Sequence, residues 1–133
     1  MGRIQNNSFG AVLIACFLVG DAGAADLGVA AEDRLHFFAT CAGRLSALME
    51  HQWMFDGAGS EITLQQNVAV ISVLDAIMPA GQGPQVLGWR ISAKVAHRAL
   101  LSSAAFSTDP QQALAAARQA EVLILPCTSM LLG

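Results

Sequence analysis

Apolar residues recur at helical spacing through most of the chain. Between Glu32 and Phe55, a helical projection gathers apolar residues on one arc and polar residues on the opposite arc, a pattern that predicts an amphipathic helix. The apolar arc consists of Leu35, Phe38, Ala42, Leu45, Met49 and Trp53. We therefore expect this helix to bury that arc in the core of the domain.

A second helical segment extends from Glu61 to Met78. Its polar residues share one narrow strip of the helix surface, so the rest of that surface is expected to be buried. The strip consists of Glu61, Gln65, Ser72 and Asp75. The β-branched run at 68–73 is also compatible with a strand, but the 3.6-residue period persists over the whole segment and favours a helix.

Turn residues separate these helices from a third. The glycine-rich residues 56–60 predict a turn before the second helix, with Ser60 as the capping residue. The Pro- and Gly-rich stretch 79–84 ends the second helix, and a third is expected from about Gln85 to Phe106.

The start of a fourth helix is the clearest local signal in the chain. Asp109 has the character of an N-cap, Pro110 suits the first helical position, and Gln112 would complete a capping box. Pro126 is expected to end this helix at about residues 123–125. Four helices joined by short connections predict an all-α fold, a small antiparallel bundle-like domain.

The N-terminal segment predicts export. The apolar run Phe9–Gly20 has the length of a signal-peptide core, and Ala22–Ala24 supplies the small-x-small pattern of a cleavage site. We expect residues 1–24 to be a cleaved signal peptide and residues 25–133 to form a single helical domain, periplasmic or secreted. The alternative is a lipoprotein anchored at Cys16, which is disfavoured because apolar residues continue beyond that cysteine.

Cleavage changes the number of cysteines in the mature chain. It removes Cys16 and leaves Cys41 and Cys127, an even pair that suits an oxidising compartment. We expect a disulfide between them that holds the last helix against the first. The alternative is two unrelated buried thiols.

The charge balance disfavours nucleic acid as a partner. Seven basic and ten acidic side chains give a formal net charge of −3, so no general attraction to a phosphate backbone is expected. Basic residues nevertheless gather on one arc of the third helix, namely Arg90, Lys94, His97 and Arg98. This basic arc is either an ordinary solvated face or a binding face for an anionic partner, an unknown protein or an anionic component of the cell envelope.

Sequence motifs for common chemistry are missing. The chain has none of the patterns typical of hydrolases, zincins, thioredoxins or c-type haem attachment. Gly57 and Gly59 begin like a dinucleotide-binding loop, but no strand is predicted before them and Ile62 occupies the position of the third glycine. No catalytic residue is assigned.

Metal or haem binding is the most specific alternative, because the chain contains three histidines and several methionines. His36 and His51 are 15 residues apart on one predicted helix, about 22 Å, so they cannot share an ion. His51 and Met54 lie one turn apart and could meet His97 from another helix. Surface histidines are the simpler interpretation, and no cofactor or metal is expected.

Trp53-Met54-Phe55 is a candidate anchor for a partner protein, since interfaces favour aromatic and methionine side chains. Trp53, however, lies on the predicted core arc. Taken together, the sequence predicts a small exported helical protein with a non-catalytic binding or accessory role in the cell envelope and no transmembrane segment in its mature chain. A metal- or haem-binding helical bundle and an enzyme without a recognisable motif are the alternatives.

The first testable prediction concerns processing. We expect the mature chain to begin at Ala25 and to carry no lipid, because the apolar segment continues past Cys16. Intact mass measurement of protein recovered from the exporting cell checks this expectation. An acylated chain that starts at Cys16 would contradict it.

Overall fold

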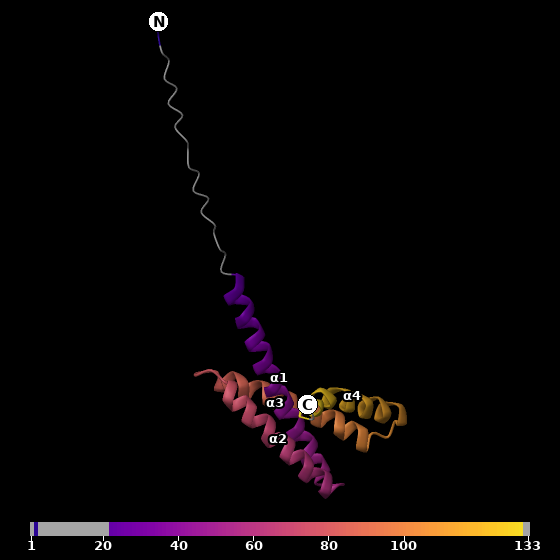
Figure 1. The fold of residues 1–133 in the computed structure, drawn as a ribbon. Helices are drawn as coiled ribbons and strands as arrows, with labels where there is room; N and C mark the ends of the chain where they lie inside the picture. The colour runs from indigo at the N-terminus through magenta and orange to yellow at the C-terminus, as the bar shows by residue number, and fades with distance from the viewer. Residues whose placement is uncertain (1, 3–21, 132–133) are drawn as a thin grey trace.

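The computed structural model describes residue 2 and residues 22–131, and the described chain is helical. It contains α1 (Ala22–Gln52), α2 (Gly57–Ile77), α3 (Gly83–Phe106) and α4 (Pro110–Ser129), as Figure 1 shows. The predicted all-α fold of four helices is confirmed, and the β-branched run at 68–73 belongs to α2. The predicted signal-peptide core and Cys16 lie outside the described residues.

Helix α1 is the central element of the domain. It contacts all three other helices, whereas α2 packs mainly on α1 and α4 packs mainly on α3. The buried core follows this arrangement, with most of its members on α1 and fewer on each neighbour. Its larger cluster consists of Leu35, Ala39, Cys41, Ala42, Leu45, Val70, Leu74, Val86 and Cys127.

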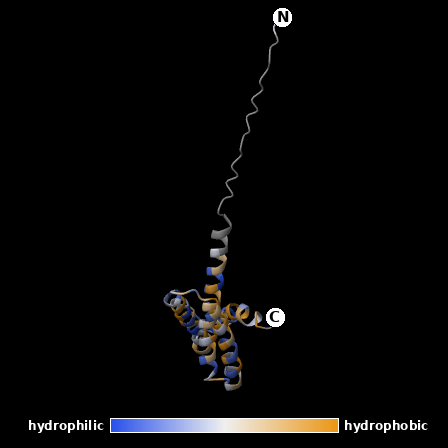
Figure 2. Cartoon of the chain, turned by 60° about the vertical axis from the view of Figure 1, so that its left-hand side comes forward, coloured by the Kyte–Doolittle hydropathy of each residue, from blue (hydrophilic) through white to orange (hydrophobic). Residues whose placement is uncertain are grey.

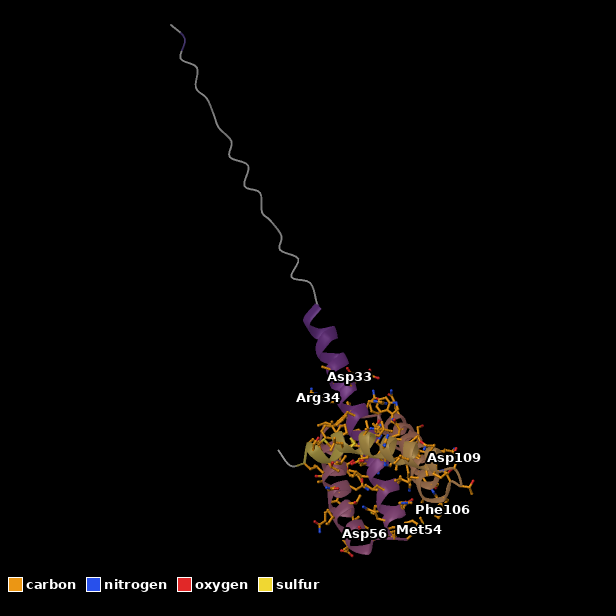
Figure 3. All side chains as sticks on the ribbon, turned by 90° about the vertical axis from the view of Figure 1, so that its right-hand side faces the viewer. Asp33, Arg34, Met54, Asp56, Phe106 and Asp109 are labelled. Atoms are coloured by element: carbon orange, nitrogen blue, oxygen red, sulfur yellow. A yellow bond between two sulfur atoms is a disulfide. The ribbon has the colours of Figure 1, made fainter. Side chains whose placement is uncertain are left out.

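The N-terminal turns of α1 extend beyond the other helices. Residues 30–34 are exposed, and Asp33 and Arg34 lie on the projecting part of the helix in Figure 3. In Figure 2 hydrophobic and hydrophilic residues alternate along the helices below this projection. The buried part of α1 therefore begins at Leu35, the first residue of the core.

A disulfide joins the first and last helices. The sulfur atoms of Cys41 and Cys127 are 2.03 Å apart, and both residues are fully buried. The bond spans 86 residues of sequence, so in the chain-entropy model it stabilises the fold by about 4 to 5 kcal/mol. The predicted pairing of these two cysteines agrees with this geometry.

The predicted burial of α2 is wrong. Its large apolar side chains are mostly exposed (Ile62, Leu64, Val68, Val73 and Ile77), while Ser60, Thr63 and Asn67 are buried. The reason is that α2 has one main neighbour and so buries only one arc. Two of the buried hydroxyl groups are hydrogen-bonded, Ser60 to the Gly57 carbonyl at 2.7 Å and Thr63 to Gln52 Oε1 at 2.6 Å.

The end of α1 also differs from the prediction. The helix ends at Gln52 rather than at Phe55, so Trp53 is in a turn and is 62% exposed instead of buried. The N-cap of α2 is Asp56, whose carboxylate accepts a hydrogen bond from the Gly59 amide at 2.9 Å. Ser60, the predicted cap, lies inside the helix because α2 begins three residues earlier.

The start of α4 confirms Asp109 as its N-cap, with the Asp109 carboxylate accepting from the Gln111 amide at 2.9 Å. The predicted capping box is wrong, because the Gln112 side chain does not reach the Asp109 amide directly; the Ser107 hydroxyl lies between them. Ser107 Oγ accepts from the Asp109 amide at 3.2 Å and donates to Gln112 Oε1 at 3.0 Å. The side chain of Gln112 therefore supports the turn through a relay.

Pro126 does not end α4, which continues to Ser129. A proline inside a helix leaves the carbonyl four residues earlier, here that of Val122, without its usual donor. The next carbonyl, that of Leu123, accepts a hydrogen bond from Arg44 Nη1 at 3.0 Å. This contact and the disulfide at Cys127 hold the final turn of α4 against α1.

Helices α1 and α3 approach each other closely at Gly43. A Cβ built at this position would overlap the carbonyl oxygen of Arg90 and would lie 3.0 Å from the Lys94 nitrogen and 3.1 Å from the Ala93 Cβ. The backbone of α3 leaves no room for a side chain here. Glycine at position 43 therefore sets the separation of the two helices and the positions of the α3 side chains beside α1.

The second prediction tests this close approach. Gly43→Ala should lower the free energy of unfolding by about 1 to 3 kcal/mol, because α3 must move to accommodate the methyl group. Gly88→Ala on α3 is the matched control, since a Cβ there meets nothing within 4 Å. It should stabilise the helix by about 0.5 to 1 kcal/mol. Urea unfolding of both variants checks the contrast, and equal effects would show that the crossing tolerates a side chain.

Candidate functional site

Three residues of the basic arc, Arg90, Lys94 and Arg98, lie along the junction between α3 and α1, which we call the α1–α3 seam. Lys94 forms an ion pair across the seam with the carboxylate of Glu50, and both side chains are about one-third exposed. Among the described residues this is the sole ion pair. Arg90 and Arg98 lie one turn to either side of Lys94 and have no carboxylate within salt-bridge distance in that part of the chain.

A cavity of about 180 Å³ lies on the Arg90 side of the ion pair. Small residues of α1 form its floor, because the helices meet closely at Gly43. The cavity is lined by Ala42, Gly43, Ser46, Leu87, Arg90, Ile91 and Lys94. It therefore combines two cationic side chains with two large apolar ones, Leu87 and Ile91.

A second cavity, of about 260 Å³, lies on the Arg98 side. It is lined by Ala47, Glu50, His51, Met54, Arg98, Ser102 and Phe106. Met54 and Phe106 are labelled at this end of the molecule in Figure 3. The His51 and Phe55 rings are 4.9 Å apart and the Phe55 and Phe106 rings 6.2 Å apart, so an aromatic cluster borders the cavity.

The predicted anchor Trp53-Met54-Phe55 lies beside this second cavity. All three side chains are exposed, as is Phe106 from α3. The structure therefore joins the anchor residues of the α1–α2 turn to the basic arc of α3, two features that the sequence presented separately. Exposed aromatic and methionine side chains next to an unpaired guanidinium are suited to binding rather than to structural packing.

An exposed apolar row runs along α3 beside its arginines. Leu87, Ile91 and Val95 repeat every four residues, and each is more than half exposed. This row was not predicted from the sequence, although the four-residue spacing beside the basic arc is visible there. Glu50 was also missed as the partner of Lys94, because a contact between residues 44 positions apart depends on how the helices pack.

The placement of His97 corrects the predicted basic arc. The sequence predicts a surface histidine, but His97 is only 1% exposed. Neither ring nitrogen has a hydrogen-bond partner among the described residues. Burial, together with the positive charge of Arg44, lowers the pKa of His97 to about 4. His97 is therefore neutral near pH 7 and does not belong to the cationic surface of the seam.

The structure also separates the candidate metal ligands. His51 and Met54 line the second cavity of the seam, whereas His97 lines a groove between α3 and α4. His36 packs against Trp89, with ring centroids 4.8 Å apart. Within residues 22–131 no three His, Cys, Asp or Glu side chains come together as a metal site would require.

Two further observations bear on what the site can do. No helix of the described chain is long and apolar enough to cross a membrane. Gly57 and Gly59 belong to the first turn of α2, where the Gly59 amide already donates to Asp56. Because that amide already donates to the capping carboxylate, it is not available to bind a phosphate.

Comparison with known proteins gives no match. No protein-family model fits the chain, and no curated protein or solved structure is significantly similar to it. The function must therefore be argued from the chemistry of the seam itself.

The third prediction follows from the burial of His97. Its pKa is lowered from 6.5 to about 4 in the folded state, so between these values the unfolded chain binds a proton that the folded chain does not. The free energy of unfolding should thus fall as the pH drops from about 6.5 to about 4, by up to about 3 kcal/mol from this residue.

Urea unfolding of wild type and His97→Leu across this pH range measures the contribution. The variant should show a flatter dependence, because leucine does not titrate. His36→Gln is the matched control, since His36 is exposed, and it should keep the wild-type dependence. A His97→Leu curve parallel to wild type would refute the assignment.

Proposed function

We propose that this protein is a small exported, non-catalytic binding or accessory protein of the cell envelope, and that its α1–α3 seam binds an anionic partner. The observation that carries the proposal is the pair of arginines, Arg90 and Arg98, that line the seam without a carboxylate within salt-bridge distance among the described residues. A guanidinium without a carboxylate partner is available to a phosphate or carboxylate group of a ligand.

The surroundings of the two arginines define the kind of partner. The exposed apolar row of Leu87, Ile91 and Val95 runs beside them on α3. A row of cations next to a row of apolar side chains matches a surface that presents anionic headgroups above an apolar layer. We therefore favour an anionic lipid surface of the envelope, with an acidic face of a partner protein as the alternative.

Export is part of the proposal. Its support is the predicted signal peptide together with the Cys41–Cys127 pair, because disulfides form and persist mainly outside the reducing cytosol. A periplasmic or secreted location would also bring the protein to the surface that the seam is proposed to bind.

The fourth prediction tests the seam by charge removal. The double variant Arg90→Gln/Arg98→Gln should bind vesicles that contain phosphatidylglycerol at least tenfold more weakly than wild type at low salt, since each basic residue near such a surface contributes about 1 kcal/mol. The affinity of wild type should fall as salt rises to physiological strength, because salt screens the attraction. Co-sedimentation with vesicles measures both effects.

The matched control is Arg34→Gln/Arg118→Gln. It removes the same charge from two exposed arginines on α1 and α4 that do not line the seam, and it should bind like wild type. Unfolding free energies of both doubles should stay within about 0.5 kcal/mol per site. Equal binding by the two doubles would mean that only net charge matters and would reject the seam. Binding to an acidic protein from an envelope extract, without vesicle binding, would favour the alternative partner.

A further inference from the structure

An apolar groove of about 290 Å³ lies between α3 and α4, away from the seam cavities. Its lining comprises Leu48, His97, Leu101, Ala104, Ala117, Ala120, Glu121 and Ile124. All but two of these residues are apolar. Small-molecule sites commonly have this character, an apolar lining with a few polar groups that orient the ligand.

Small side chains create the groove. Ala104 on α3 faces Ala117 and Ala120 on α4, where larger residues would fill the space between the two helices. Ala117 and Glu121 are exposed, so a ligand can enter from solvent without separating the helices. Leu48, Leu101 and Ile124 are buried or half-buried and supply an apolar wall.

One side of the groove carries a buried imidazole, and a guanidinium lies just outside the lining. His97 has two buried ring nitrogens without a hydrogen-bond partner in the described chain. Arg44, one turn before Leu48 on α1, is half-buried and donates to the Leu123 carbonyl beside Ile124. No carboxylate of the described residues lies within salt-bridge distance of Arg44.

The charge of Arg44 reaches the imidazole. Burial, and to a smaller extent this charge, lowers the pKa of His97, and burial also lowers the pKa of Arg44 itself. The positive charge of Arg44 therefore lies near the imidazole without a carboxylate at salt-bridge distance among the described residues. Glu121 also lines the groove, but it is exposed at the mouth and remains solvated.

We propose that the α3–α4 groove binds an aliphatic monocarboxylate, with the alkyl chain along the alanine-lined wall and the carboxylate beside His97 and turned toward Arg44, which lies just outside the lining. The apolar lining accepts the chain. The carboxylate accepts hydrogen bonds from the Arg44 guanidinium, which has further donors beyond the one used for Leu123, and from the imidazole N–H. This site is separate from the α1–α3 seam and does not depend on its proposed function.

The fifth prediction is a chain-length and headgroup preference. In calorimetric titrations of the purified, disulfide-bonded protein, affinity should rise from hexanoate to octanoate to decanoate. Decanol and decyltrimethylammonium should bind at least tenfold more weakly than decanoate, since neither supplies an anion. The imidazole resonances of His97 should shift on addition of decanoate.

Two variants locate the site. Ala117→Leu fills the groove from an exposed position and should weaken decanoate binding at least tenfold, whereas Ala115→Leu, on α4 but outside the lining, should not. Arg44→Gln should weaken decanoate binding about tenfold and leave the weak binding of decanol unchanged. Arg118→Gln, an exposed arginine of α4, is its control.

Several results would overturn the proposal. They are no saturable binding of any of the three carboxylates, equal affinity for decanoate and decyltrimethylammonium, or unchanged binding in Ala117→Leu. If Arg44→Gln fails to fold because the Leu123 carbonyl loses its donor, Ala117→Leu and the headgroup comparison still decide the question. The seam double Arg90→Gln/Arg98→Gln should bind decanoate normally, so the two sites can fail independently.

Discussion

The close approach of α1 and α3 at Gly43 is the constraint from which the positions of both candidate sites follow. With no side chain at this position, the carbonyl of Arg90 comes directly against α1, and the successive turns of α3 are placed along the neighbouring turns of α1. Lys94 consequently meets Glu50. The same contact turns His97 into the interior, while Arg98, the next residue, remains exposed. The crossing of α1 and α3 thus separates the basic arc into two parts. Arg90, Lys94 and Arg98 lie along the seam, and His97 is buried.

The second constraint is the attachment of α4 at its two ends. The short turn after α3 fixes its start through Asp109 and Ser107, and the disulfide at Cys127 fixes its last turn against α1. Between these ends, α4 rests on α3 largely through alanines, so the helices do not close over the space between them. The α3–α4 groove is the result of strong attachment at the ends and small side chains in the middle.

The number of neighbours that each helix has explains the apolar surface. Helix α1 packs against the other three helices and contributes most of the buried core residues. Helix α2 packs mainly on α1, so Ile62, Val68 and other apolar residues on its outer face are exposed. Helix α3 likewise exposes Leu87, Ile91 and Val95, of which the first two border the α1–α3 seam. On α3 this exposed apolar surface lies directly beside the arginines of the seam.

The sequence by itself determined the local features of this protein. It predicted four helices, Asp109 as the N-cap of α4 and the Cys41–Cys127 pair, because periodicity, capping and cysteine number depend on residues close in sequence or on simple counting. It failed for Trp53, His97 and the outer face of α2, because a helical projection shows which residues share an arc but not how many neighbours cover that arc. It also failed for Pro126, where Arg44 and the disulfide retain a helical turn that local rules would end. Only the packing of α3 and α4 on α1 decided which charges pair, which remain unpaired and where the cavities lie, since those outcomes depend on contacts between residues far apart in the chain.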